Sequence, residues 1–403
     1  MSVDFTVISA ALNKVIKPSI KNQLYRRAPM WQIFGGWSAE EQVAARANVN
    51  VDRFENNKMY MPLMTGNHSG IVGIAVGEKY QRGTPKLSET YSEIKTIVGS
   101  FVIPKQVLNV TDKGAVVKPL LFNSKTLAQN LAMDCNRQVF GSGNGVIATT
   151  ATSGSSATSV DLTPSVNGDI DYPRYFPEGA KIKIGSNDIT TVESVTDDDD
   201  TIVIADAQDW DASANIVKVT GSDTTSSELN GLAGMIASSG LYQGLNSSSV
   251  GSWKSYVDST TETLTTSNIR GKLHTAFFKA NKTGKVDWLV MNASAYQLYG
   301  ESMEDRLRAT QKDVLTGGWI GLDYMGGSAK VLLDYDNTDD QIQILSTEDL
   351  VFGEFQPLEF EKGTDGTLMK IDQQLDYEVT TSWMGNIGTV ARNSQAKLDN
   401  KTF

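Results

Sequence analysis

Residues 134–148 read Asp-Cys-Asn-Arg-Gln-Val-Phe-Gly-Ser-Gly-Asn-Gly-Val-Ile-Ala, and this stretch decides the architecture that we predict. It closes a helical pattern over roughly 114–140, in which apolar or small side chains recur every three or four positions. That spacing is typical of an amphipathic helix with one buried stripe. Gly141, Gly143 and Gly145 then end the helix, because glycine readily adopts the left-handed conformation that stops helices. The stretch holds no set of catalytic residues, so it indicates architecture more than chemistry.

The composition is that of an ordinary globular protein and argues against membranes and nucleic acids as dedicated binding partners. Its 403 residues, 40% hydrophobic and 21% charged, leave room for two or three domains' worth of core. Because there is no apolar run of about 18 residues, we predict no membrane-spanning helix and no membrane partner. The net charge of −11 argues against a dedicated nucleic-acid-binding protein, which would normally present a basic face.

Residues for redox, metal or acid–base chemistry are scarce. The single cysteine, Cys135, excludes an intrachain disulfide framework, and its place on the helical stripe is typical of a buried, inert thiol. His68 and His274 are the only histidines, and neither has a metal-binding partner nearby in the sequence. The first residues lack the basic and apolar regions of a secretory signal. We therefore expect synthesis in a reducing cytoplasm, no metal and no cofactor.

The first 110 residues contain apolar segments that cannot form a core of their own. Residues 24–34 place large apolar groups in a stretch too short to bury them, so we expect this arm to lie on something else, such as a neighbouring subunit. Residues 58–64 and 90–102 have strand patterns, and the loop 66–85 between them is rich in glycine and turn residues. Two strands alone cannot bury their faces in water, which predicts packing against another chain.

The middle of the chain changes character twice. Residues 149–159 are rich in Ser and Thr and have the composition of a flexible linker. Residues 158–221 then show short β patterns, clearest at 180–184, 201–204 and 215–219. We predict a small all-β insertion here, either a barrel or a sandwich.

From residue 228 onward helical and strand patterns alternate. Residues 264–280 have helical periodicity, and a strand over 286–291 is followed by a helix that begins near Asn292 or Ser294. Residues 330–333 and 341–345 predict a hairpin joined through the Asp/Asn-rich turn 336–339. The tail, 375–392, contains further strand-like segments.

Three motifs invite a chemical interpretation. Gly141-x-Gly143-x-Gly145 resembles a phosphate-binding loop, but such loops follow a strand and this one follows a helix, so the helix-stop interpretation is favoured. Asp334 and Asp336 after an apolar strand are similar to the nucleophile motif of haloacid dehalogenase-type phosphatases, although a hairpin turn explains them better. The run 197–200 of four aspartates lacks the spacing of a calcium loop and indicates a solvated turn.

The order of these segments resembles the tailed-phage major capsid proteins of the Hong Kong 97-type fold. Residues 136–148 resemble that family's segment at the end of its spine helix, and 54–67 are similar to its entrance to the extended loop. Residues 289–296 resemble its strand-to-helix step in the central domain. The resemblance covers nearly the whole chain as an ordered series, while each motif alone is only moderately specific.

This resemblance implies an α+β protein with an N-terminal arm, an extended loop, a spine helix, peripheral and axial domains, and a small all-β insertion domain. Carried over by position, the parts are the arm at 1–55, the extended loop at 56–92, the peripheral domain with the spine helix at 93–148 and 346–403, the insertion domain at 149–225, and the axial domain at 226–345.

The implied function is that of the main shell subunit, with no catalytic, metal-binding or cofactor-binding residues. Subunits would form pentamers and hexamers of an icosahedral shell around double-stranded DNA, without reading its sequence. Only about fifty residues precede the extended loop, which favours a separate scaffolding protein. A portal protein and a decoration protein are further expected partners, with assembly in the host bacterial cytoplasm and a final place in the virion. The candidate intersubunit contacts are Tyr25, Trp31, Phe34, Lys79, Tyr80, Arg82 and Lys86.

Two other classes of function remain as alternatives. A β-rich adhesin would account for the Ser/Thr-rich region 149–225, but it predicts a signal peptide or fibre-like repeats, and neither occurs. A phosphatase would use Asp334 and Asp336, but its motif normally opens a large α/β domain, and only about 65 residues follow here.

Overall fold

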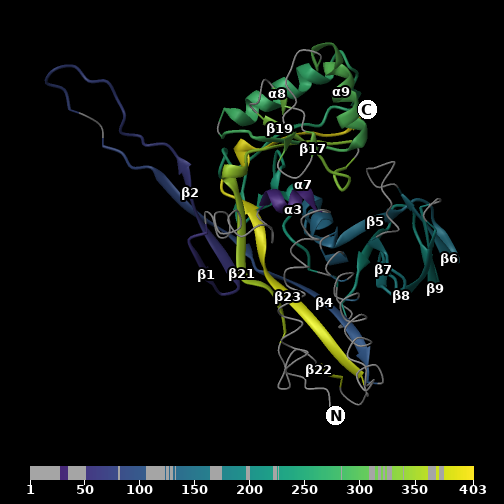
Figure 1. Ribbon diagram of the computed structural model, residues 1–403. Coiled ribbons are helices and arrows are strands. Elements are labelled where there is room, and N and C mark those ends of the chain that lie inside the picture. Colours follow the sequence, from purple (N-terminus) through teal and green to yellow (C-terminus); the bar gives the residue numbers. More distant parts are fainter. Residues whose placement is uncertain are drawn as a thin grey trace. The chain divides into compact units, whose positions relative to one another are not determined.

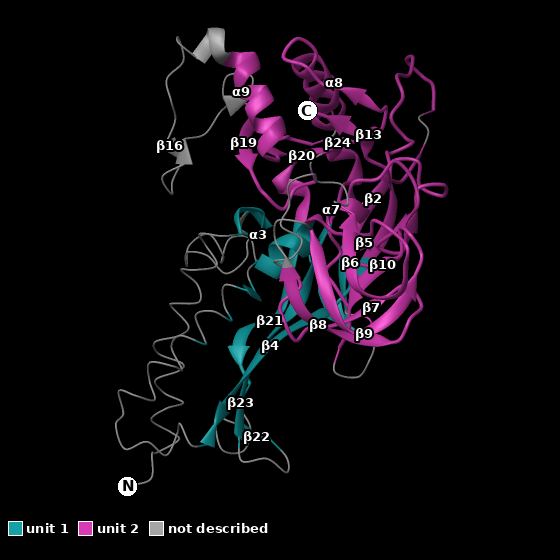
Figure 2. Ribbon diagram, turned by 90° about the vertical axis from the view of Figure 1, so that its right-hand side faces the viewer, with its two compact units in different colours: residues 1–61, 91–139, 351–388 teal, residues 62–90, 140–350, 389–403 magenta. Residues whose placement is uncertain are grey.

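The computed structural model describes a large part of the chain, in which helices and strands are mixed, so the α+β class is confirmed. The chain divides into two compact units (Figure 2), one of residues 1–61, 91–139 and 351–388 and one of 62–90, 140–350 and 389–403. The described residues are 28–34, 51–79, 82–105, 123, 127, 130, 131, 133–163, 175–196, 200–220, 225, 227–282, 284–307, 314, 315, 319, 320, 323, 324, 329–338, 340–361, 369–371 and 376–403.

The first unit is built around one long strand, β23 (Asp376–Thr389). It pairs antiparallel with β4 (Lys95–Pro104) over ten consecutive residue pairs and also with β22 (Met369–Lys370). On its other side lies β21 (Leu350–Phe360), and Figure 1 shows these long strands running together. The sequence pattern of the tail thus corresponds to a single strand where we expected several segments.

Aromatic packing forms the core of this unit. Trp31, on helix α3 (Pro29–Phe34), meets Phe352 and Trp383 edge-on, each with 5.5 Å between ring centroids. The amide of Trp31 donates a hydrogen bond of 3.1 Å to the side-chain oxygen of Asn136. Asn136 lies on the helix over 133–140, so α3 is fixed both to that helix and to the sheet.

The predicted long helix ends before Gly141, as the glycines that follow it predict. Residues 133–140 are helical, and Gly143 and Gly145 follow with φ of +79° and +76°, which are left-handed values. Upstream, 123, 127, 130 and 131 are also helical, and the rest of the predicted span 114–140 lies outside the described residues. A Cβ at Gly143 would lie 2.9 Å from the carbonyl oxygen of Leu229, so glycine is needed here for space as well.

The β-rich insertion in the second unit is a closed six-stranded barrel with its own apolar core. The strands follow the order β10-β5-β6-β9-β8-β7 around the barrel, and all six are labelled in Figure 2. Of the two architectures predicted from the sequence, the barrel is therefore the correct one. The strands are β5 (Val146–Thr150), β6 (Gly154–Thr163), β7 (Lys181–Ile184), β8 (Ile189–Thr196), β9 (Thr201–Trp210) and β10 (Asn215–Lys218).

The prediction of a flexible linker over 149–159 is wrong, because this stretch forms parts of β5 and β6. Its side chains and backbone form hydrogen bonds with other strands and turns of the barrel. The Thr150 hydroxyl donates to the carbonyl of Asp211 at 2.7 Å and accepts from the amide of Ala214 at 2.9 Å. The indole N–H of Trp210 donates to the Thr152 carbonyl at 3.0 Å. Ser/Thr-rich composition therefore reflected hydrogen bonding within a small barrel rather than chain flexibility.

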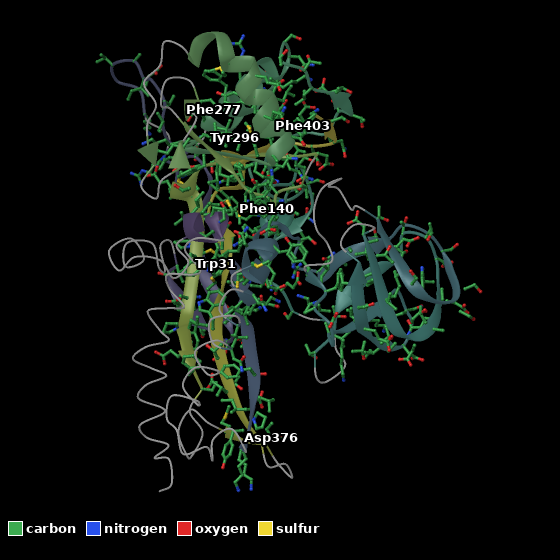
Figure 3. The ribbon with its side chains drawn as sticks, turned by 45° about the vertical axis from the view of Figure 1, so that its right-hand side comes forward. Trp31, Phe140, Phe277, Tyr296, Asp376 and Phe403 are labelled. Carbon is green, nitrogen blue, oxygen red and sulfur yellow. The ribbon has the colours of Figure 1, made fainter. Side chains whose placement is uncertain are left out.

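A second sheet of this unit has the order β13-β24-β20-β15-β19-β18. Two helices, α8 (Ile269–Asn281) and α9 (Ala293–Leu307), accompany it, and Figure 3 shows Phe277, Tyr296 and Phe403 in their shared apolar region. The Asn292 side chain accepts from the Ala295 amide at 2.9 Å, a helix cap at the predicted position. The strands are β13 (Tyr256–Asp258), β15 (Trp288–Met291), β18 (Asp323–Tyr324), β19 (Ala329–Leu333), β20 (Ile342–Leu345) and β24 (Ala396–Leu398).

The predicted hairpin of 330–333 with 341–345 is wrong. Both segments are strands, but β15 lies between them, parallel to β19 and antiparallel to β20. Burial explains this arrangement, because Leu289, Val290 and Met291 of β15 are fully buried and take the central place in the sheet. The predicted turn instead passes across the end of β15.

Short elements complete the second unit. Helix α8 begins at Ile269 rather than near 264, because β14 (Glu262–Thr263) pairs in parallel with β25 (Lys401–Thr402). No helix in the described part of the chain is long and apolar enough to cross a membrane. The remaining elements are β11 (Leu241–Tyr242), β12 (Leu245–Asn246), β16 (Val314–Leu315), β17 (Trp319–Ile320), helix α7 (Leu232–Met235), and the 3-10 turns η4 (Thr347–Asp349) and η5 (Arg392–Ser394).

A cluster of charges holds β25 in place. The buried ammonium of Lys401 lies 3.2 Å from Asp258 Oδ1 and 2.9 Å from Glu262 Oε1, and Lys272 Nζ approaches the same Glu262 oxygen to 2.7 Å. Partial burial tends to raise the pKa of Asp258, but hydrogen bonds from Thr260 and Lys401 hold it below its ordinary value. Hydrogen bonds from Lys272 and Lys401 lower the pKa of Glu262.

This cluster predicts a loss of stability in acid that depends on Lys401. Carboxyl groups with lowered folded-state pKa values stabilise the fold above about pH 4.5, and this stabilisation is lost as the pH falls through those lower values. We expect the unfolding free energy of the Lys401→Met variant to fall by fewer kcal/mol between pH 6 and pH 3 than that of the parent. Urea unfolding at the two pH values tests this, and equal losses in both proteins would contradict it.

Candidate intersubunit surface

A two-stranded excursion presents the most exposed apolar surface among the described residues. It starts from the hairpin of β1 (Arg53–Glu55) and β2 (Lys58–Gly66), whose turn residues Asn56 and Asn57 have φ of 50° and 59°. Two consecutive left-handed residues define the tight hairpin turn that matches the twist of antiparallel strands. Asparagine tolerates this conformation well, which explains the sequence Glu-Asn-Asn-Lys at this point.

The strands of the excursion are joined by side chains as well as by backbone. β2 pairs with β3 (Lys86–Glu93), and the Thr65 hydroxyl lies 3.2 Å from both the Lys86 carbonyl and the Ser88 hydroxyl. Near the base of the excursion, the ammonium of Lys58 stands 3.9 Å above the ring of Tyr91. These contacts hold β2 and β3 together where the loop begins and ends.

The tip of the loop, residues 70–77, reads Gly-Ile-Val-Gly-Ile-Ala-Val-Gly. Its four large aliphatic side chains are exposed, from 48% for Ile74 to 107% for Val76, with Val72 and Ile71 between at 52% and 85%. Scattered exposed apolar residues need no explanation, but here four lie within six consecutive positions of one loop. We name Ile71, Val72, Ile74 and Val76 the tip patch.

Local bonds give the loop a defined course around the tip patch. The amide of Gly70 donates to His68 Nδ1 at 3.1 Å, and the amide of Ala75 donates to Glu78 Oε2 at 3.0 Å. A Cβ at Gly83 would lie 2.2 Å from the Ser69 hydroxyl oxygen, so only glycine permits the two sides of the loop to approach so closely. The tip patch therefore belongs to a loop that is ordered by local hydrogen bonds and whose apolar side chains are exposed to solvent.

Three of the predicted contact residues lie on the returning side of the loop. Lys79, Arg82 and Lys86 are exposed, and Lys86 lies at the start of β3, beside Gly66. Tyr25 and Tyr80 lie outside the described residues. The sequence patterns did not single out the tip patch, because glycine and turn residues dominate the loop 66–85. The four aliphatic residues between Gly70 and Gly77 are the signal that could have revealed it.

The prediction that Trp31 and Phe34 contact a neighbour is corrected by the structure. Both side chains are buried within their own chain, at 1% and 3% exposed, and Trp31 packs on Phe352 and Trp383. The segment 24–34 cannot form a core alone, as the sequence indicated, but residues far along the same chain complete that core.

The motifs with chemical interpretations have structural roles. Asp334 is buried, and its Oδ1 accepts the amide of Asp336 at 2.9 Å within the turn after β19, which is a structural role rather than that of an exposed nucleophile. Burial, with a smaller contribution from Asp134, raises the pKa of the Cys135 thiol, so the thiolate form is disfavoured. Among the described residues, no three His, Cys, Asp or Glu side chains gather as metal ligands do.

Comparison with known proteins gives matches among solved structures alone. No protein-family model and no curated protein matches the chain. A chain of the cyanophage A-1(L) capsid asymmetric unit matches with 12% identity and a TM-score of 0.47, covering 94% of this chain and 93% of that one. The capsid of a native GTA particle matches with 9% identity and a TM-score of 0.47, covering 89% and 88%. The capsid of the myovirus phage XM1 matches with 9% identity and a TM-score of 0.42, covering 88% and 89%.

The matching structures are capsid proteins. Capsids of cyanophages and of a myovirus stand among the first of them. At these identities the likeness concerns the fold.

Proposed function

We propose that this chain is the major capsid protein of a tailed double-stranded DNA phage. The observation that carries the proposal is the tip patch, because a lone subunit would leave these four aliphatic side chains in water on a loop that has no core of its own. In a closed shell of identical subunits, the patch of every copy can be buried against a neighbouring subunit, because each subunit contributes both surfaces of the contact.

The domain assignment drawn from the resemblance is part of this proposal. The arm is residues 1–55, the extended loop 56–92, the peripheral domain 93–148 and 346–403, and the axial domain 226–345. The insertion domain, 149–225, is extended at its start by β5, since the barrel begins at Val146. The tip patch then belongs to the extended loop, and the long strands β4, β21 and β23 belong to the peripheral domain.

The barrel has a charge that suits a place outside the shell. Residues 146–218 hold thirteen Asp and Glu and four Lys and Arg, a net charge of −9 out of −11 for the whole chain. Packed DNA would repel so acidic a module, whereas the rest of the subunit is close to neutral. In the proposed shell the barrel faces outward, and the inner wall encloses DNA without reading its sequence.

The remaining parts of the proposal concern partners and place. Subunits form pentamers and hexamers, helped by a separate scaffolding protein, and join a portal protein and a decoration protein. Assembly takes place in the host bacterial cytoplasm, and the mature protein resides in the virion. The subunit itself performs no catalysis.

Electron microscopy of the purified, overexpressed chain tests the proposal, alone and with its candidate scaffolding protein. We expect shells, tubes or capsomer rings that display five- or six-fold symmetry. A chain that stays monomeric under every condition, as judged by sedimentation in parallel, would contradict the proposed function.

A further inference from the structure

The aspartate-rich turn after β19 is firmly attached to the six-stranded sheet. The amide of Asp334 donates to the Met291 carbonyl at 3.0 Å, and Asp334 Oδ1 in turn accepts the amide of Asp336. The side-chain amide of Asn337 donates to the carbonyls of Val290 at 3.3 Å and Gln341 at 3.0 Å. Two of these bonds reach the end of β15, so the turn is a fixed point on the sheet.

One side chain of the barrel reaches this fixed point. Tyr175 is buried with the barrel's apolar core, and its hydroxyl donates a hydrogen bond to the carboxylate of Asp336. A hydroxyl that donates to an ionised carboxylate forms a stronger bond than one between neutral groups. The bond joins two parts of the second unit that are 161 residues apart in the sequence.

The covalent connection of the barrel has the character of a hinge. The chain enters the barrel through Gly143 and Gly145, both in the left-handed conformation. The returning chain lies against this entrance, with the amide of Ala233 donating to the Gly141 carbonyl at 3.3 Å. Glycines permit large changes of backbone dihedral angle. The two chain segments that enter and leave the barrel therefore fix its position, but they restrain its rotation only weakly.

We propose that Tyr175 and Asp336 form a latch that fixes the orientation of the barrel on the six-stranded sheet. The hinge at 141–145 and the latch are two separated points of attachment, and both are needed to define an orientation. This gives the Asp-x-Asp motif a role: Asp334 shapes the turn, and Asp336 holds the barrel. The latch belongs to the single chain and does not depend on the proposed capsid function.

Hydrogen exchange of the full-length chain tests the latch through Tyr175→Phe. This variant removes the hydroxyl and leaves the ring in the barrel core. We expect backbone amides over 141–146 and 229–235 to exchange about tenfold faster, the order expected for losing one hydrogen bond to a charged acceptor. Amides in the barrel strands β7 and β9 should keep their protection, because the barrel core is unchanged.

Two further variants make the result decisive. Asp336→Ala removes the acceptor from outside the barrel and should reproduce the faster exchange, and the double variant should add nothing more, since both remove the same bond. Tyr299→Phe is the matched control, a buried tyrosine of the same unit that lies on α9 in the apolar core of the six-stranded sheet, and it should leave the hinge amides unchanged. Unchanged hinge exchange in Asp336→Ala, or independent additive effects of the two latch variants, would overturn the proposal.

Discussion

Replacing Ile71, Val72, Ile74 and Val76 together with serine is expected to abolish particle assembly while leaving the thermal stability of the subunit unchanged. Stability should not change because these side chains are exposed, and exposed substitutions usually shift unfolding free energy by less than about 0.5 kcal/mol. Assembly should fail because each aliphatic side chain fully buried at a contact contributes about 1.5–3 kcal/mol. A loss of even about 1.4 kcal/mol per contact raises the subunit concentration needed about tenfold.

Sedimentation and electron microscopy at matched concentrations measure this effect. The matched control exchanges the same four residues among themselves, as Ile71→Val, Val72→Ile, Ile74→Val and Val76→Ile, which keeps the apolar surface and should preserve assembly. Shells formed by the serine variant at the parent's concentration would refute the role of the tip patch. A clear fall in its melting temperature would show that the patch is packed within the subunit.

The loop that carries the tip patch also shows which features of the fold can be predicted from local signals in the sequence. Strand alternation and turn residues correctly indicated that the chain leaves and returns around residues 66–85, because these signals are local. The helix stop at Gly141 and the cap at Asn292 were predictable for the same reason. Each depends on residues within a few positions of one another.

The errors came from partners that are distant in the sequence. β19 and β20 looked like a hairpin because eight residues separate them, but β15, more than thirty residues earlier, takes the place between them. Trp31 looked unpartnered because Phe352 and Trp383 lie more than 300 residues away. Local patterns show that a side chain needs a partner, but the fold decides whether that partner belongs to the same chain.

Arg392 is the clearest case of a residue whose importance only the structure shows. It lies at the end of the strand-like tail, yet its guanidinium is buried and donates to three backbone carbonyls, those of Gly234, Met235 and Trp253, at 3.2, 2.9 and 3.3 Å. It also stands 5.1 Å from the ring centre of Tyr242. Burial raises the pKa of Tyr242, so this ring is neutral and the contact is one of cation and aromatic face.

We therefore expect Arg392→Ala to lower the free energy of unfolding by about 3–5 kcal/mol, because several buried hydrogen bonds to one charged donor are lost together. The carbonyls of Gly234 and Trp253 would lose the donor that Arg392 supplies, while that of Met235 keeps the Ser255 hydroxyl at 3.5 Å, and each unmet buried group costs about 1–3 kcal/mol. Arg392→Lys is the matched control and should lose less, because an ammonium keeps the charge but lacks the planar set of donors that meets three carbonyls at once. Urea unfolding at neutral pH measures both variants. Equal losses would contradict this expectation, because lysine keeps the charge and the side-chain stem, and the planar donors of the guanidinium would then account for the whole stabilising contribution of Arg392.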